Sequence, residues 1–527
     1  MRGPFLSLPV PKDHPSPQGP SSAFFISTPS RPFCCSLSSP ANWNFIIHND
    51  KLLSMRTLVQ DIVKKVGEEV ELMGWVAARR DHGKIIFIDL RDRSGIAQIV
   101  FVPKPKELYD LANRLRSEWV VRIVGQVNVR PANMENPDLP TGKYEILAKE
   151  LEILSEAQTP PIAIDTPGYE IGEESRMKYR YLDLRRSRLA RNLKMRSATI
   201  NLLNNYFKAR DFVEVETPIL GKSTPEGARD YLVPSRLYPG KFYALPQAPQ
   251  QYKQLLMVAG LERYFQVARC FRDEDTRGDR QPEFTQIDFE MSFAARDEVL
   301  EFIEKLMIEL VKNVYPEKTI SQVPFPRLSY KEAMEKYKSD KPDLRPSTSS
   351  GSKDPNELAF VWVADFPFYE WNEKEKKWDF GHNPFSMPYG EELPDDDYSD
   401  GEGKNGKLGK VVATQYDLVL NGFEVAGGSI RNHKPELLKK AFRLLGYDDK
   451  MIMEKFGHMI EAFSYGAPPH GGAAIGFDRL MMILLNEINI RETIAFPKTG
   501  DGQDLMSNAP SEVDEKQLKE LHIKITK

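Results

Sequence analysis

The chain has 527 residues, of which 41% are hydrophobic and 28% are charged. This composition is typical of a globular protein with a large core and excludes a disordered chain. At about 150 residues per domain, the length predicts roughly three domains. The net charge of -4 excludes a uniformly basic nucleic-acid binder but leaves room for a local basic face. No apolar run approaches the roughly 20 residues of a membrane-spanning helix. Only Cys34, Cys35 and Cys270 occur, which excludes a disulfide scaffold.

Residues 1–54 differ in composition from the rest of the chain. The first 40 residues contain nine prolines and nine serines and show no hydrophobic period. Three interpretations are open: a disordered extension, an organellar transit peptide, or translated sequence upstream of a true start at Met55. The third is favoured, because arginines are few and no amphipathic helix is evident. It predicts a cytoplasmic protein, whereas a transit peptide predicts an organellar one.

Residues 55–157 are predicted to form an OB-fold barrel. A helical stretch at 106–117 lies between the third and fourth of five short β-like segments. The expected strands are 69–80, 84–90, 95–102, 120–129 and 143–154. This order matches the partly open five-stranded Greek-key barrel that binds oligonucleotides. A generic small barrel without a ligand is the alternative.

The rest of the chain is predicted to be a hinge followed by a larger α+β domain. Residues 158–190 begin with a Thr-Pro-Pro sequence and continue with a basic run, which is typical of a linker. In residues 191–527 helices and strands mix. An apolar stripe predicts an amphipathic helix at 297–314, and the polar segment 339–360 predicts a surface loop.

Residues 269–290 form the most informative segment. A strand-like run enters a charged loop, and an alternating run leaves it, as in a hairpin. Five polar residues have even numbers and could share one face of that hairpin, although the long loop leaves the relative register of the two arms open: Arg272, Glu274, Gln286, Asp288 and Glu290. Arginines of this kind bind phosphate bidentately, and Phe284 could stack on a base. On spacing alone, a solvated ion-pair network explains the segment equally well.

Two further segments favour a phosphate ligand. Residues 470–480 form a Gly-rich strand that turns into a helix through Arg479, where the helix dipole already favours anions. In residues 415–431, Asp417 and Glu424 are two carboxylates separated by apolar spacers. Such a pair suits Mg²⁺, which usually takes one or two carboxylates together with substrate phosphates.

Together these strings closely resemble the three signature motifs of class II aminoacyl-tRNA synthetases. Motif 1 resembles residues 212–220, motif 2 resembles residues 271–274, and motif 3 resembles residues 476–479. The match is closer still to the bacterial-type aspartyl-tRNA synthetases, on residues 224–234 and 244–256. This resemblance implies an OB-fold anticodon-binding domain followed by a class II catalytic domain, an antiparallel sheet flanked by helices. It also implies a homodimer with Pro218 of motif 1 at the interface.

The resemblance assigns an aspartate site. Lys253 and Arg431 would bind the side-chain carboxylate, since two cations select an acid and reject a neutral amide. His382 would lie over the amino acid, and Arg272 would also contact it. The α-ammonium end would be served by Glu226, Gln250 and Asp288.

The resemblance also assigns an ATP site with Mg²⁺. Arg272 would hold the α-phosphate, Glu274 the adenine amino group and Phe284 the adenine face, while Arg479 would lie towards the γ-phosphate. The other implied ATP-site residues are Asp273, Gln281, Gly476, Phe477 and Asp478. Asp417 and Glu424 would hold the metal. The implied catalytic residues are Arg272, Arg479 and Glu424.

In the barrel, the resemblance implies that Arg80, Phe87 and Gln98 read the tRNA anticodon, with Phe87 stacking on a base. His82 lies in the first loop of the barrel. Histidine at the matching position resembles enzymes that charge both tRNA(Asp) and tRNA(Asn), and leucine resembles strict enzymes. A neutral surface histidine is the alternative.

Two departures from the family are evident. The bacterial enzymes normally carry an inserted domain of about a hundred residues after the sequence found here at 339–345, where this chain has only a short loop. The family also usually has a second histidine where this chain has Asn383.

The predicted activity is two-step aminoacylation of tRNA(Asp), or of both tRNAs, with aspartate. The alternatives are an asparaginyl- or lysyl-tRNA synthetase, a catalytically inactive RNA-binding paralogue, and an ammonia-dependent asparagine-forming enzyme on the same catalytic fold. Lys253 and Arg431 argue against a lysine substrate, which they would repel, and the barrel argues against the last alternative.

Overall fold

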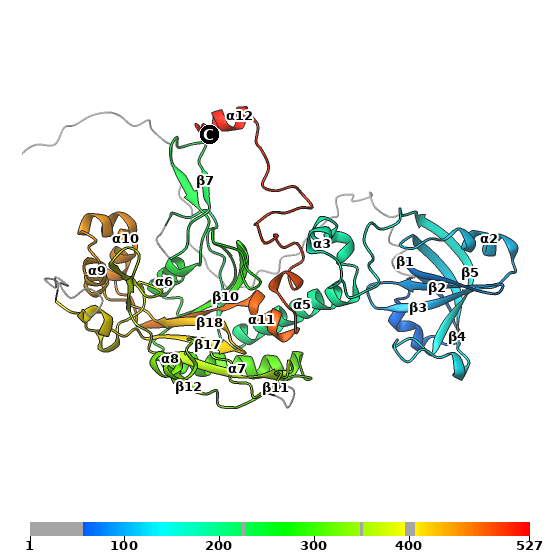
Figure 1. The fold of residues 1–527 in the computed structure, drawn as a ribbon, viewed down its shortest axis with the longest axis horizontal. Coiled ribbons are helices and arrows are strands. Elements are labelled where there is room, and N and C mark those ends of the chain that lie inside the picture. Colours follow the sequence, from blue (N-terminus) through cyan, green and yellow to red (C-terminus); the bar gives the residue numbers. More distant parts are fainter. Residues whose placement is uncertain (1–55, 224–226, 348–350, 396–405, 527) are drawn as a thin grey trace, which may run out of the picture. The chain divides into compact units, whose positions relative to one another are not determined.

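The computed structural model describes residues 56–223, 227–347, 351–395 and 406–526. The chain forms two compact units, Met1–Ala157 and Gln158–Lys527, whose elements are shown in Figure 1. Among the described residues, no helix has the length and apolar character needed to cross a membrane. The three interpretations of residues 1–54 concern a segment outside the described residues.

The first unit is a five-stranded barrel. Its elements are β1 (Glu69–His82), β2 (Ile85–Arg91), β3 (Ile96–Phe101), α2 (Lys106–Arg114), β4 (Val120–Val129) and β5 (Tyr144–Ser155). All five predicted strands and the intervening helix are present. The barrel is closed, in the order β1-β2-β3-β5-β4, and not partly open as expected. A parallel β3–β5 pair and an antiparallel β1–β4 pair close it, so every strand has two neighbours.

The core of the barrel explains why these segments are strands. Each strand contributes an inward β-branched residue that is fully buried: Val76, Ile88, Ile99, Ile123 and Ile146. Along β2, buried residues alternate with partly exposed ones, as the side-chain period of two requires. The outer face is therefore free to carry polar residues.

The second unit is built on an eight-stranded sheet in the order β12-β14-β17-β18-β19-β10-β9-β6. Neighbouring strands are antiparallel except in the β12–β14 and β6–β9 pairs at the two edges. The strands are β6 (Val213–Glu214), β9 (Arg263–Phe271), β10 (Glu283–Ser292), β12 (Arg327–Ser329), β14 (Phe360–Ala364), β17 (Gln415–Leu420), β18 (Phe423–Ile430) and β19 (His470–Gly476). This mixture of an antiparallel sheet with helices confirms the predicted α+β class.

Helices cover both faces of this sheet. On one face, α5 (Ser187–Lys208), α7 (Arg296–Val314) and α11 (Phe477–Leu484) share a hydrophobic core with the strands. On the other face lies α6 (Gln250–Val258); Figure 1 shows α6 and α7 on opposite sides of the sheet. The amphipathic helix predicted at 297–314 is α7, whose apolar stripe is buried as expected. Beyond the sheet, α9 (Pro435–Arg443) and α10 (Asp449–Ser464) form a smaller core of their own.

The segment predicted as a hinge, residues 158–190, belongs to the second unit. It contains α3 (Glu173–Lys178) and α4 (Arg180–Asp183). Asp183 is fully buried and forms ion pairs with Arg176 at 3.1 Å, with Arg180 at 2.7 Å and with Arg186 at 2.6 Å. These contacts fix the helices locally, and a hinge function for the segment stays a prediction.

The segment 339–360, predicted as a surface loop, follows α8 (Tyr330–Tyr337). Most of its described residues are irregular, but it also contains β13 (Glu357–Leu358), which pairs in parallel with β11 (Thr319–Ile320). The C-terminal end of this loop is therefore fixed by the pairing of β13 with β11.

Candidate active site

The two arms of the motif 2 hairpin pair in the register that the even-number prediction requires. Gln286 lies opposite Ala268, and Asp288 lies opposite Gln266, so even-numbered positions of both arms share one face. Odd-numbered Ile287 and Phe289 are fully buried in the hydrophobic core on the other face. One face of β9 and β10 therefore packs in the hydrophobic core, and the opposite face carries the polar residues.

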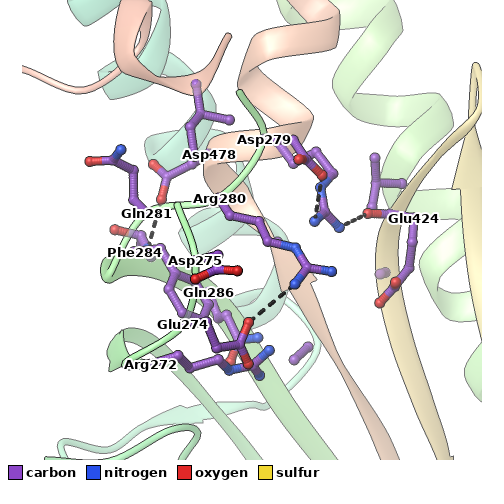
Figure 2. A pocket seen from close by; sticks show the side chains of 17 residues that line it. Arg272, Glu274, Asp275, Asp279, Arg280, Gln281, Phe284, Gln286, Glu424 and Asp478 are labelled. Carbon is purple, nitrogen blue, oxygen red and sulfur yellow. Dashed lines mark hydrogen bonds and ion pairs between the residues drawn. The ribbon is translucent and has the colours of Figure 1, made fainter. Parts of the chain in front are cut away.

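A cavity of about 240 Å³ opens over the end of this polar face. The predicted nucleotide-site residues that line it are Arg272, Glu274, Gln281, Phe284, Glu424, Gly476, Asp478 and Arg479. They come from the motif 2 hairpin, from β18 and from the junction of β19 with α11. Figure 2 shows the Arg280 and Glu274 side chains pointing toward each other in this cavity, with an ion pair of 3.2 Å.

The cavity combines an aromatic wall with unsatisfied donors. The Arg272 guanidinium lies 5.1 Å from the ring centroid of Phe284. The Nε atoms of Arg272 and Arg479 are buried and make no hydrogen bond to any described residue. Buried donors without partners are costly unless a ligand satisfies them. An aromatic face beside two such guanidinium groups suits a nucleotide base and its phosphates.

Arg479 connects strand β18 with the loop of motif 2. It donates to the backbone carbonyl of Glu424 at 2.6 Å and pairs with Asp279 of the motif 2 loop at 3.1 Å. Because it stands in the first turn of α11, its charge adds to the positive end of the helix dipole.

Two predicted ATP-site residues do not line the cavity, and two that line it also make structural contacts. Asp273 is not among the residues that line the cavity, and Phe477 is fully buried in the hydrophobic core of the second unit. Asp478 accepts from the Thr285 backbone N–H at 2.8 Å, which fastens α11 to β10. The amide of Gln281 lines the cavity but exchanges two hydrogen bonds with the Lys498 backbone.

A second cluster of charges lies farther along β10, under α6. Lys253 of α6 pairs with Asp288 at 2.7 Å and with Glu290 at 3.1 Å. Arg431 follows β18 and pairs with Glu290 at 2.8 Å, while its other nitrogens reach Ser429 and the Gly472 carbonyl. All four charged side chains are almost completely buried. Glu290 is the missed residue here: its even number placed it on this face, but no role was assigned to it.

The charges of this cluster are coupled to one another. Burial by itself raises the pKa of Glu290, but Arg431 and Lys253 outweigh it and lower the pKa to about 2. Burial raises the pKa of Asp288, and Lys253 opposes that shift only in part. Asp288 Oδ2 is buried and accepts no hydrogen bond from the described residues. This oxygen is suited to receive a cationic ligand group.

The remaining predicted aspartate-site residues lie in different surroundings. Gln250 is buried at the start of α6 and donates to Gln254 at 2.9 Å. His382 is exposed and packs its ring edge-on against Phe366, with the ring centroids 5.0 Å apart. Glu226 lies outside the described residues.

Asn383, which departs from the family pattern, caps the turn that follows it. Its side-chain oxygen accepts from the Phe385 backbone N–H at 2.8 Å. Phe385 is fully buried in the small core of α9 and α10. The asparagine thus ties the segment of His382 to a packed core.

Asp417 and Glu424, the predicted metal ligands, lie close to one another beside Gly427. A Cβ built on Gly427 would come within 2.9 Å of Asp417 Oδ1 and 3.5 Å of Glu424 Oε1, so glycine keeps the space between the two carboxylates open. Burial and then the charge of Glu424 raise the pKa of Asp417 well above its ordinary value. Two facing carboxylates of this kind fit Mg²⁺. The described residues contain no group of three or more His, Cys, Asp or Glu arranged for a metal.

In the barrel, the structure brings three predicted residues together on the outer face. Arg80 lies opposite Phe87 in the β1–β2 register and is 3.4 Å from Gln98 Oε1. Arg80 also pairs with both oxygens of Asp89, at 2.5 and 2.7 Å, an acid that sequence reasoning missed. His82, predicted to lie in the first loop of the barrel, is instead the last residue of β1, where it pairs with Ile85 and is exposed.

Comparison with known proteins identifies the family. Residues 172–500 match the model of the class II tRNA synthetases (D, K and N), and residues 70–154 match the OB-fold nucleic acid binding domain. The chain belongs to the class II tRNA synthetases. The Aspartate--tRNA(Asp/Asn) ligase of Rubrobacter xylanophilus is 43% identical, over 87% of this chain and 95% of that protein. The enzyme of the same name from Phenylobacterium zucineum is 41% identical, over 87% of this chain and 96% of that protein.

Solved structures of class II synthetases share the fold. Aspartyl tRNA synthetase from Entamoeba histolytica matches with a TM-score of 0.64 at 22% identity, over 87% of this chain and 94% of that one. Asparaginyl-tRNA synthetase from Pyrococcus horikoshii, complexed with asparaginyl-adenylate, matches with a TM-score of 0.65 at 21% identity, over 84% and 98%.

This synthetase is shorter than its relative where the two align. The alignment with the R. xylanophilus enzyme runs over 579 positions, more than the 527 residues of the present chain, although it covers only 87% of the chain. The relative therefore carries additional sequence with no counterpart here. The expected position of that difference, at residues 339–360, stays a prediction.

Proposed function

We propose that this synthetase is an aspartate–tRNA ligase that activates L-aspartate with ATP and transfers it to tRNA(Asp). The observation that carries the proposal is the buried cluster in which Lys253 and Arg431 approach the same carboxylate, Glu290. Two buried cations beside the nucleotide cavity favour an acidic amino acid. They repel lysine, and they give asparagine no compensation for the charge it lacks.

The proposed orientation of aspartate follows from the charged groups of the cluster that can still form a hydrogen bond or an ion pair with a ligand. The side-chain carboxylate would bind the guanidinium of Arg431 and the ammonium of Lys253. The α-ammonium group would donate to Asp288 Oδ2, the buried oxygen without a partner among the described residues. This orientation pairs the side-chain carboxylate and the α-ammonium group with opposite charges on side chains that are almost completely buried.

The first chemical step is an in-line displacement. An oxygen of the aspartate α-carboxylate attacks the α-phosphorus of ATP, the bond to the bridging oxygen breaks, and pyrophosphate leaves. Arg272 would hold the α-phosphate while Phe284 stacks on adenine, and Arg479 would neutralise the departing phosphates. Mg²⁺, held by Asp417 and Glu424 when bound, would supply further charge neutralisation on the phosphates.

The second step needs no protein nucleophile. A hydroxyl of the terminal ribose of tRNA attacks the carbonyl carbon of aspartyl-adenylate. The acyl–phosphate bond breaks, and AMP leaves with its electrons and takes up the hydroxyl proton on a phosphate oxygen. The guanidinium of Arg272 that held the α-phosphate would stabilise the leaving AMP.

Aspartate-dependent ATP–pyrophosphate exchange tests the proposal directly. The purified chain should exchange label with aspartate and not with asparagine or lysine. Lys253→Met, which keeps much of the side-chain volume but removes the cation, should lose aspartate exchange. Exchange with asparagine or lysine instead would overturn the substrate assignment, and no exchange with any of the three would favour the inactive RNA-binding paralogue.

We further propose that tRNA(Asn) is a second acceptor. The name of the two relatives above covers both tRNAs, and His82 is exposed at the end of β1, near the strand positions of Arg80 and Phe87. The purified chain should charge a pure tRNA(Asn) transcript with aspartate, and His82→Leu should lower kcat/KM for tRNA(Asn) more than for tRNA(Asp). No detectable aspartyl-tRNA(Asn) would end this part of the proposal.

A homodimer through motif 1 is also proposed. Ile219 and Leu220, which follow Pro218, are 40% and 52% exposed and so leave apolar surface next to motif 1. Sedimentation of the purified protein as a monomer at micromolar concentration would contradict this. The cytoplasmic location stays a prediction.

A further inference from the structure

The proposed metal ligand Glu424 already has a cationic partner from the chain itself. Lys341 Nζ lies 3.1 Å from Glu424 Oε2, while Oε1 of the same carboxylate faces Gly427 and Asp417. The side chains of Lys341 and Glu424 are 36% and 34% exposed, so water and ions can reach this pair. Lys341 itself does not line the nucleotide cavity, whereas Glu424 does.

Lys341 is carried by a loop that is fastened on several sides. Asp343 in this loop pairs with Arg345 at 2.9 Å and with Lys353 at 3.0 Å. The loop also packs on the turn between β17 and β18, where a Cβ on Gly422 would lie 3.4 Å from the Cβ of Asp343. Gly422 has a φ of +88°, a backbone conformation that disfavours larger residues. The hairpin that carries Asp417 and Glu424 therefore also positions the loop of Lys341.

The negative charge of Asp417 and Glu424 is large enough to attract a divalent cation in addition to Lys341. Asp417 and Glu424 bring two carboxylates together. Lys341 and Arg479 are cations that act on Glu424. Arg479 is itself paired with Asp279, so the two carboxylates are neutralised only in part. A divalent cation between the carboxylates would supply the rest, but it would also stand close to the ammonium of Lys341 and repel it. Since both cations need the Glu424 carboxylate, they cannot use it independently.

We propose that Lys341 is a positioning residue that competes with the divalent cation for Glu424. In the metal-free protein its ammonium holds the carboxylate at the rim of the cavity, and it releases the carboxylate when the metal binds with the nucleotide. The inference rests on the metal site in the proposed function. It makes the short loop at 339–345 responsive to metal binding.

Binding of Mn²⁺ to the full-length protein without nucleotide tests the competition, because the EPR signal of free Mn²⁺ measures affinity without any turnover. Lys341→Met should bind Mn²⁺ about 1.5-fold to fivefold more tightly than the wild type, the size expected when an exposed ion pair is removed as a competitor. Lys341→Arg, which keeps the charge, should stay near the wild type. Lys331→Met is the matched control, because it removes an exposed lysine whose partner, Glu335, lies on its own helix.

Two results would overturn the inference. Equal or weaker Mn²⁺ binding by Lys341→Met, compared with Lys331→Met, would show that Lys341 does not compete. Binding that Asp417→Asn fails to weaken, in both the wild-type and the Lys341→Met background, would remove the metal site on which the inference depends. Aspartate-dependent exchange in the same preparations separates these failures from failure of the proposed function, since exchange can persist when the competition does not exist.

Discussion

At the scale of residues, the active-site charges are arranged in opposed pairs. Lys253 and Arg431 both contact Glu290, and Lys253 also contacts Asp288, so no buried charge of this cluster stands alone. An isolated buried charge would cost several kcal/mol. The pairs therefore compensate these buried charges within the chain itself, and Asp288 Oδ2 keeps no hydrogen-bond partner among the described residues.

Arg272→Ala should lower the rate of aspartate-dependent exchange by about 10²- to 10³-fold, the usual loss when a group that stabilises transition-state charge is removed. The physical reason is that its guanidinium lies in the cavity beside Phe284 and has a free Nε among the described residues. Arg269→Ala is the matched control, because that arginine of the same strand is exposed and pairs with Glu283 at 2.7 Å. Near-wild-type exchange by Arg272→Ala would contradict the assigned role.

At the scale of elements, a buried ion network joins the start of the second unit to the nucleotide site. Arg176 of α3 pairs with Asp183 and, at 2.7 Å, with Glu492 of the short helix η6 (Ile490–Glu492). The backbone N–H of Ile490 then donates to Gly278 in the motif 2 loop at 2.9 Å. The network therefore holds helix η6 in place. Ile490 of this helix lines the cavity.

Asp183→Asn should lower the free energy of unfolding of the second unit by about 3–5 kcal/mol, because it leaves buried arginines without their shared carboxylate. Burial raises the pKa of Asp183, but Arg176 and Arg186 outweigh it and hold the pKa below its ordinary value of 3.8. The carboxylate is thus more acidic in the folded protein. Its contribution is fully present above that ordinary value and is lost as the pH falls through the lower folded value.

Denaturant unfolding at a series of pH values measures this effect. The difference between wild type and Asp183→Asn should be constant near neutral pH and shrink below the ordinary pKa of Asp183. Glu301→Gln, which breaks an exposed pair with Lys305 on α7, should change the free energy by less than about 0.5 kcal/mol. A difference of equal size in strong acid and at neutral pH would contradict the charge argument.

At the scale of the whole molecule, the residues of the proposed adenylate chemistry and those of the proposed tRNA recognition belong to different units. Each unit has its own hydrophobic core. The cavity and the aspartate cluster lie entirely within residues of the second unit, and Arg80, Phe87 and Gln98 lie on the barrel. The two steps of aminoacylation should therefore respond separately to substitutions.

Phe87→Ala should raise KM for tRNA about tenfold or more, since stacking of one base on an aromatic side chain contributes about 1–3 kcal/mol. Aspartate-dependent exchange should stay unchanged, because no residue of the barrel lines the described cavity. Steady-state charging and exchange, measured on one preparation, compare the two steps. Substitution of Tyr109, a partly buried aromatic packed on the barrel core, by phenylalanine serves as the control. A parallel loss of exchange would contradict the separation.

Local patterns in the sequence were sufficient for much of the fold and for the family. Strand β2 and helix α7 each have one buried side and one more exposed side. The period of two in β2 and the apolar stripe of α7 follow from this and could be recognised without tertiary contacts. The even-numbered polar residues on the two strands of motif 2 lie on one face, as predicted. The antiparallel pair places even positions opposite even positions in this register. Closure of the barrel was missed, since it depends on pairing between distant strands.

The sequence by itself determined the family and the α+β class, because these are properties of short contiguous strings. From the same strings it also predicted the side chains of the proposed chemistry. Only the tertiary structure decided how those side chains meet. Glu290 stands between Lys253 and Arg431, Lys341 reaches Glu424, and Phe477 turns into the core although its neighbours line the cavity. Each of these outcomes depends on how separate elements pack in three dimensions, and no spacing along the chain encodes which of several nearby charges will be closest.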